Sequence, residues 1–395
     1  MPIAGKHVRT KKRAEPFGFF EFFAGGGMAR AGLGSTWDCL FSNDFDYKKS
    51  ACYAANWGND VHVTKDVAKV ETSELPGVPH LVWASFPCQD LSLAGMGAGL
   101  KGDRSGTFWP FWRIIEKLGT EGRAPELIVL ENVCGTLTSH GGKDFAAIAD
   151  ALTDQGYSFG AVVLDAAEFI PHSRPRLFVI GVAGNLAIPS ALVSDVATSR
   201  HTRALITAKE KLSRKAKARW IWWNIPKAPK RTTRFADLVE EHPTGVQWHT
   251  PAETAKLLAM MSPLNLEKVK KAQRSRELHV GAIYKRTRAD ENGVKVQRAE
   301  VRFDELAGCL RTPAGGSSRQ LILVVKGKSV RSRLISTRET ARLMGLMDSY
   351  KLPQNYNEAY HLTGDGVAVP VVRHIAAHVL EPIIYQNSTK AKAAA

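Results

Sequence analysis

The sequence predicts an α/β fold built on a doubly wound, mostly parallel sheet. Short apolar runs, typical of buried strands, alternate with segments whose apolar residues recur at helical spacing. Several of these runs end in polar or glycine-rich residues, as expected at the ligand-binding edge of such a sheet. The strand runs are 17–23, 39–42, 61–63, 81–84, 127–130, 162–164 and 177–180, and the clearest helical segments are 107–118, 143–152 and 367–380.

The first strand, 17–23, ends in Ala24-Gly25-Gly26-Gly27, and a helical pattern begins at Met28. Glycines let the backbone approach a ligand closely, and the first turn of a helix offers free N–H groups to an anion. The second strand run ends at Asp44, where nucleotide-binding sheets place an acid for the ribose hydroxyls. We therefore predict a nucleoside pocket, with Asp44 on the ribose and Phe45 over an adenine face.

Three more strand runs end in side chains that can do chemistry. Asp66 and Val67 follow the third strand, Cys88 follows the fourth, and Glu131 follows the fifth. Because the carboxyl ends of parallel strands meet at one edge, these residues should lie near the glycine turn. A cysteine is more often a small core residue than a nucleophile, so the convergence, and not Cys88 alone, favours a reactive thiol. Residues 171–176 add a rigid loop with two arginines.

The net charge of +16 is concentrated in the stretches 200–234, 268–298 and 326–342. This charge favours a polyanionic partner, nucleic acid first, because neutralising phosphates releases counterions. The five cysteines form no CxxC pair, which argues against a disulfide framework or a zinc site and favours a reducing cytosol. No apolar stretch approaches the roughly 20 residues of a membrane span. We expect a soluble protein that needs no metal.

Several motifs follow one another in a family-specific order. They are Phe23-Ala24-Gly25-Gly26-Gly27, Phe86-Pro87-Cys88-Gln89, Glu131-Asn132-Val133, Arg174-Pro175-Arg176, the stretch 338–345 and Gly364-Asp365-Gly366-Val367. In this order the sequence resembles the cytosine-C5 DNA methyltransferases of bacterial or phage type. The motifs cover most of the first 183 residues and most of the last 65.

The resemblance implies a Rossmann-like domain that binds S-adenosylmethionine, and a smaller, irregular, strand- and loop-rich target-recognition domain. The expected organisation is a basic flexible tail (1–16), the catalytic and cofactor-binding domain (17–183), the target-recognition domain (184–330), a return segment whose last helix packs on the catalytic domain (331–385), and a tail (386–395). Within the recognition domain, 283–325 reads as short strands with glycine-rich turns.

The chemistry of the expected reaction assigns the catalytic roles. Carbon 5 of cytosine is a poor nucleophile, and a thiolate that adds to carbon 6 makes carbon 5 enamine-like. Cys88 is the predicted nucleophile. Glu131 and Arg176 would stabilise the charge that develops on the ring at nitrogen 3 and the carbonyl oxygen. Arg174 would hold the loop or a neighbouring carboxylate, with a phosphate contact as the alternative.

The resemblance also implies the binding residues. The cofactor would contact Phe23, Ala24, Gly25, Gly27, Asp44, Phe45, Asp66, Val67, Phe86, Pro87, Asp365 and Gly366. Duplex DNA would contact Gln89, Ser92, Arg104, Arg311, Thr312, Gly315 and Gly316. Because a thiol cannot reach carbon 6 inside a stacked duplex, the base must be flipped out, and the glycine-rich loop 92–105 would close over it.

Four residues depart from the family pattern: Glu21 replaces an aspartate, Met28 a glycine, His172 a glutamine and Asp365 an asparagine. We expect a monomeric cytoplasmic enzyme, with a companion restriction endonuclease as a further partner. The alternatives are an RNA cytosine-C5 methyltransferase and a DNA-binding regulator that has lost catalysis. A nicotinamide-dependent dehydrogenase is the weakest alternative, because the glycine turn lacks GxGxxG spacing.

Overall fold

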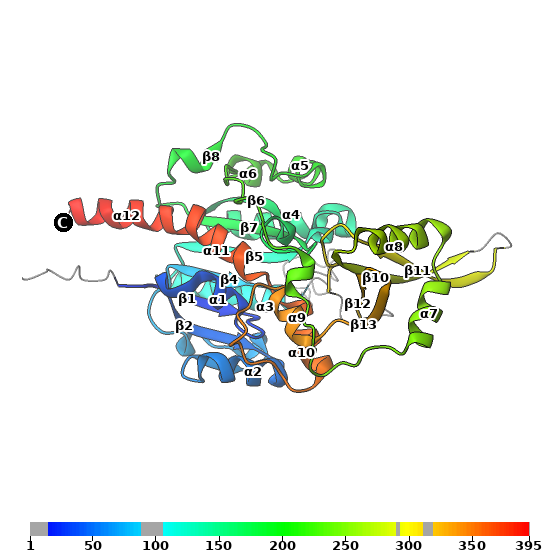
Figure 1. Cartoon of the computed structure of the whole chain (residues 1–395). Helices are drawn as coiled ribbons and strands as arrows, with labels where there is room; N and C mark the ends of the chain where they lie inside the picture. The colour runs from blue at the N-terminus through cyan, green and yellow to red at the C-terminus, as the bar shows by residue number, and fades with distance from the viewer. Residues whose placement is uncertain (1–14, 88–105, 290–292, 311–318, 395) are drawn as a thin grey trace, which may run out of the picture.

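The computed structural model describes residues 15–87, 106–289, 293–310 and 319–394, and its larger unit is built on a seven-stranded sheet (Figure 1). The strand order is β3-β2-β1-β4-β5-β7-β6, and only β7 runs antiparallel to its neighbours. The mostly parallel α/β fold is therefore confirmed. The strands are β1 (Phe17–Phe22), β2 (Trp37–Asp44), β3 (His62–Thr64), β4 (Leu81–Ala84), β5 (Leu127–Val133), β6 (Tyr157–Asp165) and β7 (Pro175–Ala183).

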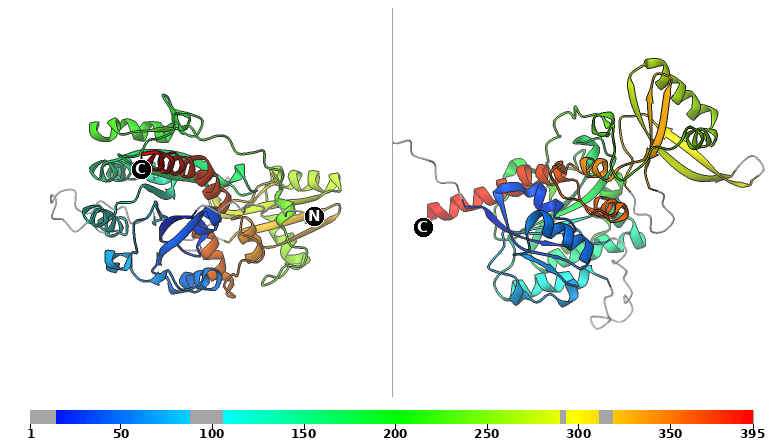
Figure 2. Two further views of the ribbon diagram at one scale, coloured as in Figure 1. Left: turned by 90° about the vertical axis from the view of Figure 1, so that its left-hand side faces the viewer. Right: turned by 60° about the horizontal axis from the view of Figure 1, so that its bottom comes forward.

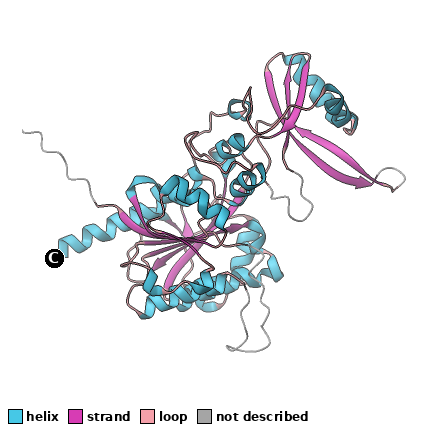
Figure 3. Ribbon diagram, turned by 90° about the horizontal axis from the view of Figure 1, so that it is seen from below, coloured by secondary structure: helices cyan, strands magenta, loops and turns pink. Residues whose placement is uncertain are grey.

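Helices cover both faces of this sheet, as Figure 3 shows from below. Successive strand residues point to opposite faces, so Leu81 and Trp83 of β4 join one apolar core while Val82 and Ala84 join the other. The first core includes α1 (Met28–Leu33), α11 (Val369–Ile375) and α12 (Glu381–Ala394), and the second includes α3 (Phe108–Thr120) and α4 (Lys143–Asp154). Helix α2 (Tyr47–Trp57) packs beside β3.

Residues 184–225, grouped above with the recognition domain, pack against the large sheet. This segment forms α5 (Arg203–Glu210), α6 (Arg214–Ala218) and a two-stranded sheet of β8 (Val193–Ser194) and β9 (Trp222–Trp223). Leu205 of α5 lies in the core that α3 and α4 form, and Trp223 lies in the opposite core. By packing, residues 184–225 therefore belong to the larger unit.

The smaller unit is an antiparallel sheet with the order β11-β10-β12-β13. Its strands are β10 (Leu278–Ala289), β11 (Lys295–Arg302), β12 (Leu321–Lys326) and β13 (Ser329–Leu334), and α7 (Pro251–Ala259) and α8 (Pro263–Ser275) pack on it. The expectation of only short strands here is wrong for β10, which has 12 residues. Figure 2, right, shows this sheet standing away from the larger unit.

The return segment carries α9 (Thr337–Arg342) and α10 (Tyr356–Asp365) and joins the two units. Its helical run Tyr356–Thr389 is long and apolar enough to cross a membrane by length and composition alone. However, 61% of the most apolar window of that run is buried inside the structure. The packing of α11 and α12 on α1 and the large sheet accounts for this apolar character.

A fully buried ion pair ties β13 to α9. Arg333 donates two hydrogen bonds to the carboxylate of Glu339 (2.8 and 2.6 Å), and neither side chain is exposed. The same carboxylate accepts from the backbone N–H groups of Glu240 and Ser336, both at 2.7 Å. Because every lone pair is engaged, the charges are compensated in a site that water does not reach.

We predict that Glu339→Leu lowers the free energy of unfolding by about 3–5 kcal/mol, because it leaves the Arg333 charge buried without a partner. The double variant R333M/E339L should recover part of this loss, because no uncompensated charge remains. Urea unfolding of the three proteins measures both effects. A double variant less stable than E339L would contradict the prediction.

Candidate active site

The turn after β1 closes on the carboxylate at the end of β2. The Gly25 N–H donates to Asp44 Oδ2 (2.8 Å), and the Asp46 N–H donates to Oδ1 (2.9 Å). Gly25 and Gly27 have positive φ (56° and 77°), as does Phe23 (57°), a conformation unfavourable for a bulky side chain. Asp44 thus holds a strained turn at the carboxyl edge of the sheet, and burial raises the pKa of its carboxyl.

A cavity of about 420 Å³ opens at this edge. Nine of the predicted cofactor residues line it: Phe23, Ala24, Gly25, Asp44, Phe45, Phe86, Pro87, Asp365 and Gly366. Gly27, Asp66 and Val67 do not. Asp66 instead caps a short helical turn by accepting the Ala68 N–H (2.9 Å), and Val67 is buried in the core. The structure therefore brings the ends of β1, β2, β4 and β5 together around one space.

Glu131 and Arg176 meet at the wall of this cavity. They come from neighbouring strands, and the amino end of β7 lies at the carboxyl end of β5 because the two strands are antiparallel. The Arg176 Nε lies 3.2 Å from Glu131 Oε1, and both side chains are largely buried. Burial raises the pKa of Glu131, although Arg176 and Arg174 pull it down. The site thus combines a carboxyl that tends to hold a proton with a guanidinium.

Arg174 is fully buried behind the cavity and does not line it. It donates to the carbonyl oxygens of Gly364 (2.7 Å) and Gly366 (2.6 Å), and its Nη1 contacts the Cys309 sulfur at 3.7 Å. Burial, and then the charge of Arg176, lower its pKa to about 10. Arg174 therefore positions the turn that forms the far wall of the cavity.

His172 joins three distant segments. Its Nδ1 lies 2.8 Å from the Leu343 carbonyl oxygen, and its Nε2 accepts the Leu310 N–H (3.4 Å). Burial lowers the pKa of His172 to about 3, so the ring is neutral, with its proton on Nδ1. The residue that replaces the family's glutamine thus links the arginine loop, the smaller unit and α9.

Eight predicted residues lie outside the described residues: Cys88, Gln89, Ser92, Arg104, Arg311, Thr312, Gly315 and Gly316. Phe86 and Pro87, directly before Cys88 in the chain, line the cavity. The Asn132 side chain donates to the Phe86 carbonyl oxygen (3.0 Å) and holds this stretch beside β5.

Several residues that line the cavity were not predicted to bind the cofactor or to act in catalysis, including Glu21, Lys49, Ser85, Asn132 and Leu362. Asn132 belongs to the motif Glu131-Asn132-Val133, so the sequence already indicated that it lies near the site. No local pattern predicts a role for Lys49, because its partner Asp365 lies 316 residues away in the chain. The Lys49 Nζ donates to Asp365 Oδ2 at 2.8 Å. Among the described residues, no group of three or more His, Cys, Asp or Glu side chains is placed to hold a metal ion.

The chain from residue 17 to residue 381 matches the family described as C-5 cytosine-specific DNA methylase. The protein belongs to this family. It is therefore a DNA (cytosine-5-)-methyltransferase, and the family and the fold are those of S-adenosylmethionine-dependent enzymes.

Curated relatives and solved structures agree with this assignment. The chain is 26% identical to the Type II methyltransferase M.BsuFI of Bacillus subtilis, over 93% of this chain and 73% of that one. It is 24% identical to the Type II methyltransferase M.HhaI of Haemophilus parahaemolyticus, over 91% and 93%. The Dnmt2 methyltransferase of S. pombe shares the fold, with a TM-score of 0.55 and 17% identity over 93% of this chain and 99% of that one.

Glu21 is an unusual member of the cavity wall. Its side chain is 1% exposed, and its Oε2 has no hydrogen-bond partner within the described ranges. The backbone N–H groups of Arg30 and Ala29, in α1, offset part of the cost of burial. Burial nevertheless raises the pKa of Glu21 to about 8.

We predict that Glu21 makes the protein less stable as the pH rises. A carboxyl with a pKa of 4.5 when unfolded and about 8 when folded favours folding fully below pH 4.5, and this contribution is lost as the pH rises through 8. Between pH 5 and 8 the free energy of unfolding should fall by about 3–5 kcal/mol relative to Glu21→Gln, which does not titrate. Urea unfolding of both proteins across this range measures the difference. A difference that stays constant with pH would contradict the prediction.

Proposed function

We propose that the enzyme transfers the methyl group of S-adenosylmethionine to carbon 5 of a flipped-out cytosine in duplex DNA, through a covalent bond from Cys88 to carbon 6. The main support is the pairing of Glu131 with Arg176 at the cavity wall. Phe86 and Pro87, directly before Cys88 in the chain, line the same cavity. A nucleophile, an acid and a cation would thus face one base.

The cavity suits the cofactor chemically. The unpartnered Glu21 oxygen faces a space where a cationic group would stabilise its ionised form. Asp44 keeps carboxylate oxygens near the turn for ribose hydroxyls, and Phe45, 69% exposed, offers a free aromatic face for adenine. When bound, S-adenosylmethionine supplies an electrophilic methyl group on its sulfonium. Gly25 and Gly366 would let the ligand approach the backbone on two sides.

The protein's residues then act on the base. The Cys88 thiolate adds to carbon 6, while the Glu131 carboxyl donates its proton to ring nitrogen 3. The raised pKa of Glu131 suits this role, because burial shifts the carboxyl toward the protonated form that can donate. Arg176 would stabilise the charge on the carbonyl oxygen. After methyl transfer, water would take the proton from carbon 5, and the bond from carbon 6 to sulfur would break to free the Cys88 thiolate. Ring nitrogen 3 would return its proton to Glu131.

We further propose that the smaller unit chooses the DNA sequence, with residues 311–318 between β11 and β12 entering the duplex. The curated relatives are named Type II methyltransferases, which supports a cytoplasmic enzyme paired with a companion restriction endonuclease. The basic charge of the chain and its size are consistent with a monomer that binds duplex DNA without a second subunit.

We predict that Cys88→Ala lowers methyl transfer to duplex DNA at least about 10³-fold, because the covalent step is lost. Wild-type enzyme with labelled cofactor and a 5-fluorocytosine-containing duplex should form an adduct that resists denaturation. Cys134→Ala is the matched control, since it removes a partly exposed thiol other than Cys88 and should still form the adduct.

Two results would overturn the proposal. An adduct that survives C88A would exclude Cys88 as the nucleophile. Methyl transfer to tRNA but not to duplex DNA would show that RNA is the substrate. In either substrate, identification of the product as 5-methylcytosine would establish which ring position is modified.

A further inference from the structure

The β10–β11 hairpin extends well beyond the sheet that contains it. Residues Leu278–Ile283 of β10 pair with β12, but Tyr284–Ala289 pair only with β11. At a rise of about 3.3 Å per residue, these six residues form a ribbon about 20 Å long. Figure 1 shows the ribbon leaving the compact part of the molecule, and Figure 3 shows the same projection from below.

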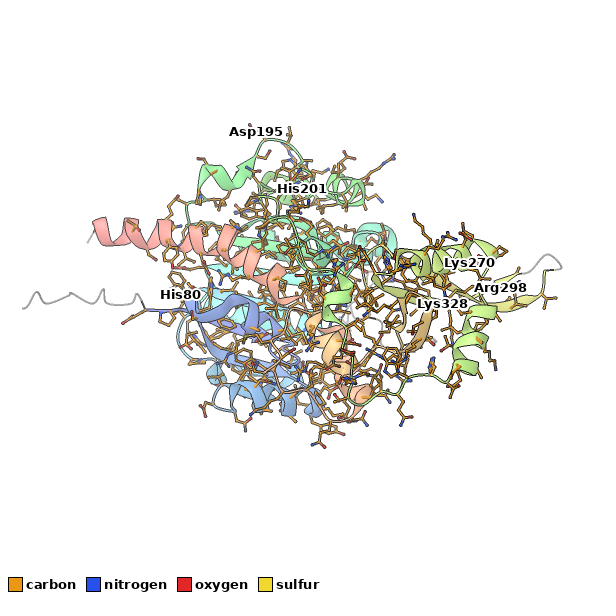
Figure 4. All side chains as sticks on the ribbon, in the orientation of Figure 1. His80, Asp195, His201, Lys270, Arg298 and Lys328 are labelled. Atoms are coloured by element: carbon orange, nitrogen blue, oxygen red, sulfur yellow. The ribbon has the colours of Figure 1, made fainter. Side chains whose placement is uncertain are left out.

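One face of this ribbon is rich in arginine. Residues directly opposite in an antiparallel pair point to the same face, and here Arg286 lies opposite Arg298. Like charges in this arrangement repel each other, and Glu300, whose carboxylate lies 3.5 Å from Arg286 Nε, offsets only one charge. Arg286 and Arg298 are both exposed, and Figure 4 labels Arg298 on the ribbon. An anion placed over this face would relieve the repulsion.

The arginine face continues into a cavity of about 970 Å³ between the ribbon, the start of α8 and the arginine loop. Among the described residues, five cations and one carboxylate, that of Glu300, line this cavity. The cations are Arg176, Lys268, Arg286, Arg298 and Arg302. Arg176 pairs with Glu131 and Arg302 with Asp304, which leaves Arg286 and Arg298 of the ribbon as its main source of positive charge. Arg176 also lines the cavity at the sheet edge, so the two cavities adjoin each other.

We propose that the arginine face of the β10–β11 ribbon binds the sugar-phosphate backbone of duplex DNA on one flank of the target cytosine. The inference rests on the proposed function, since it takes the duplex as the substrate of the adjacent site. A reach of about 20 Å corresponds to roughly six base pairs, or half a helical turn, at about 3.4 Å per base pair. The ribbon would therefore contact phosphates beyond the bases that the loop reads.

Backbone phosphates fit this face better than base edges. Phosphates form a dense array with one negative charge per about 3.4 Å along each strand, which matches two neighbouring arginines. Contacts to phosphates position a protein without reading sequence, so the effect of the ribbon should not depend on the flanking bases.

The test compares charge-matched double variants in the full-length protein. Arg286→Gln/Arg298→Gln removes two charges from the ribbon face, and Lys270→Gln/Lys328→Gln removes two from α8 and the β12–β13 turn, outside the cavity (Figure 4). Affinity for labelled 30-base-pair duplexes is measured by fluorescence anisotropy at several salt concentrations. R298Q alone is a second ribbon variant that leaves the Arg286–Glu300 contact in place, and thermal unfolding checks that every variant folds.

We expect the R286Q/R298Q variant to bind duplex DNA at least about tenfold more weakly than wild type near 0.15 M salt, on every flanking sequence tested. The slope of log affinity against log salt concentration should fall in magnitude by about two. R298Q should reduce the slope by about one. Removing six base pairs from one flank of the duplex should weaken binding by wild-type protein and leave binding by the R286Q/R298Q variant nearly unchanged.

Equal losses of DNA affinity in the R286Q/R298Q and K270Q/K328Q variants, or no loss in either variant, would overturn the inference. A loss confined to one flanking sequence would overturn the assignment to phosphates and favour base contacts. Methyl transfer by wild-type enzyme to the same duplexes is measured in parallel. If wild-type enzyme methylates no duplex, the proposed function fails by itself. If wild-type enzyme methylates the duplexes and the R286Q/R298Q variant binds them as tightly as wild type, only the role of the ribbon fails.

Discussion

The direction of β7 decides at which edge of the sheet Arg176 meets Glu131. Because β7 runs antiparallel beside β5, its amino end, with Arg176, lies next to Glu131 at the carboxyl edge of the sheet. A parallel strand in the same place would put the arginine loop at the opposite edge. The same loop carries Arg174 and His172 to the segments that close the cavity.

The return segment completes the site from the far end of the chain. Gly364 and Gly366 accept hydrogen bonds from Arg174, and the Tyr350 hydroxyl donates to the Gly26 carbonyl oxygen at 2.7 Å. A Cβ at Gly26 would lie 2.2 Å from that hydroxyl, so only glycine fits there without movement. Tyr350, a loop residue more than 300 positions downstream, therefore helps to fix the geometry of the first turn.

Two buried acids at the proposed active site lack full compensation. Glu21 and Glu131 both line the catalytic cavity and both have raised pKa values. By contrast, the Glu339 carboxylate, buried with Arg333, accepts four hydrogen bonds. The first arrangement is suited to proton transfer and ligand binding, and the second to holding two units together.

Local sequence patterns were enough to predict the strands of the large sheet, the glycine turn and the position of Asp44, because apolar periodicity and turn residues act over a few neighbours. The family resemblance added the expected reaction, and with it the roles of Glu131 and the arginine loop. The packing of 184–225 on the large sheet, the pairing of Lys49 with Asp365 and the length of the β10–β11 ribbon were decided only by tertiary structure. Each depends on contacts between residues far apart in the chain, and no local pattern encodes such contacts.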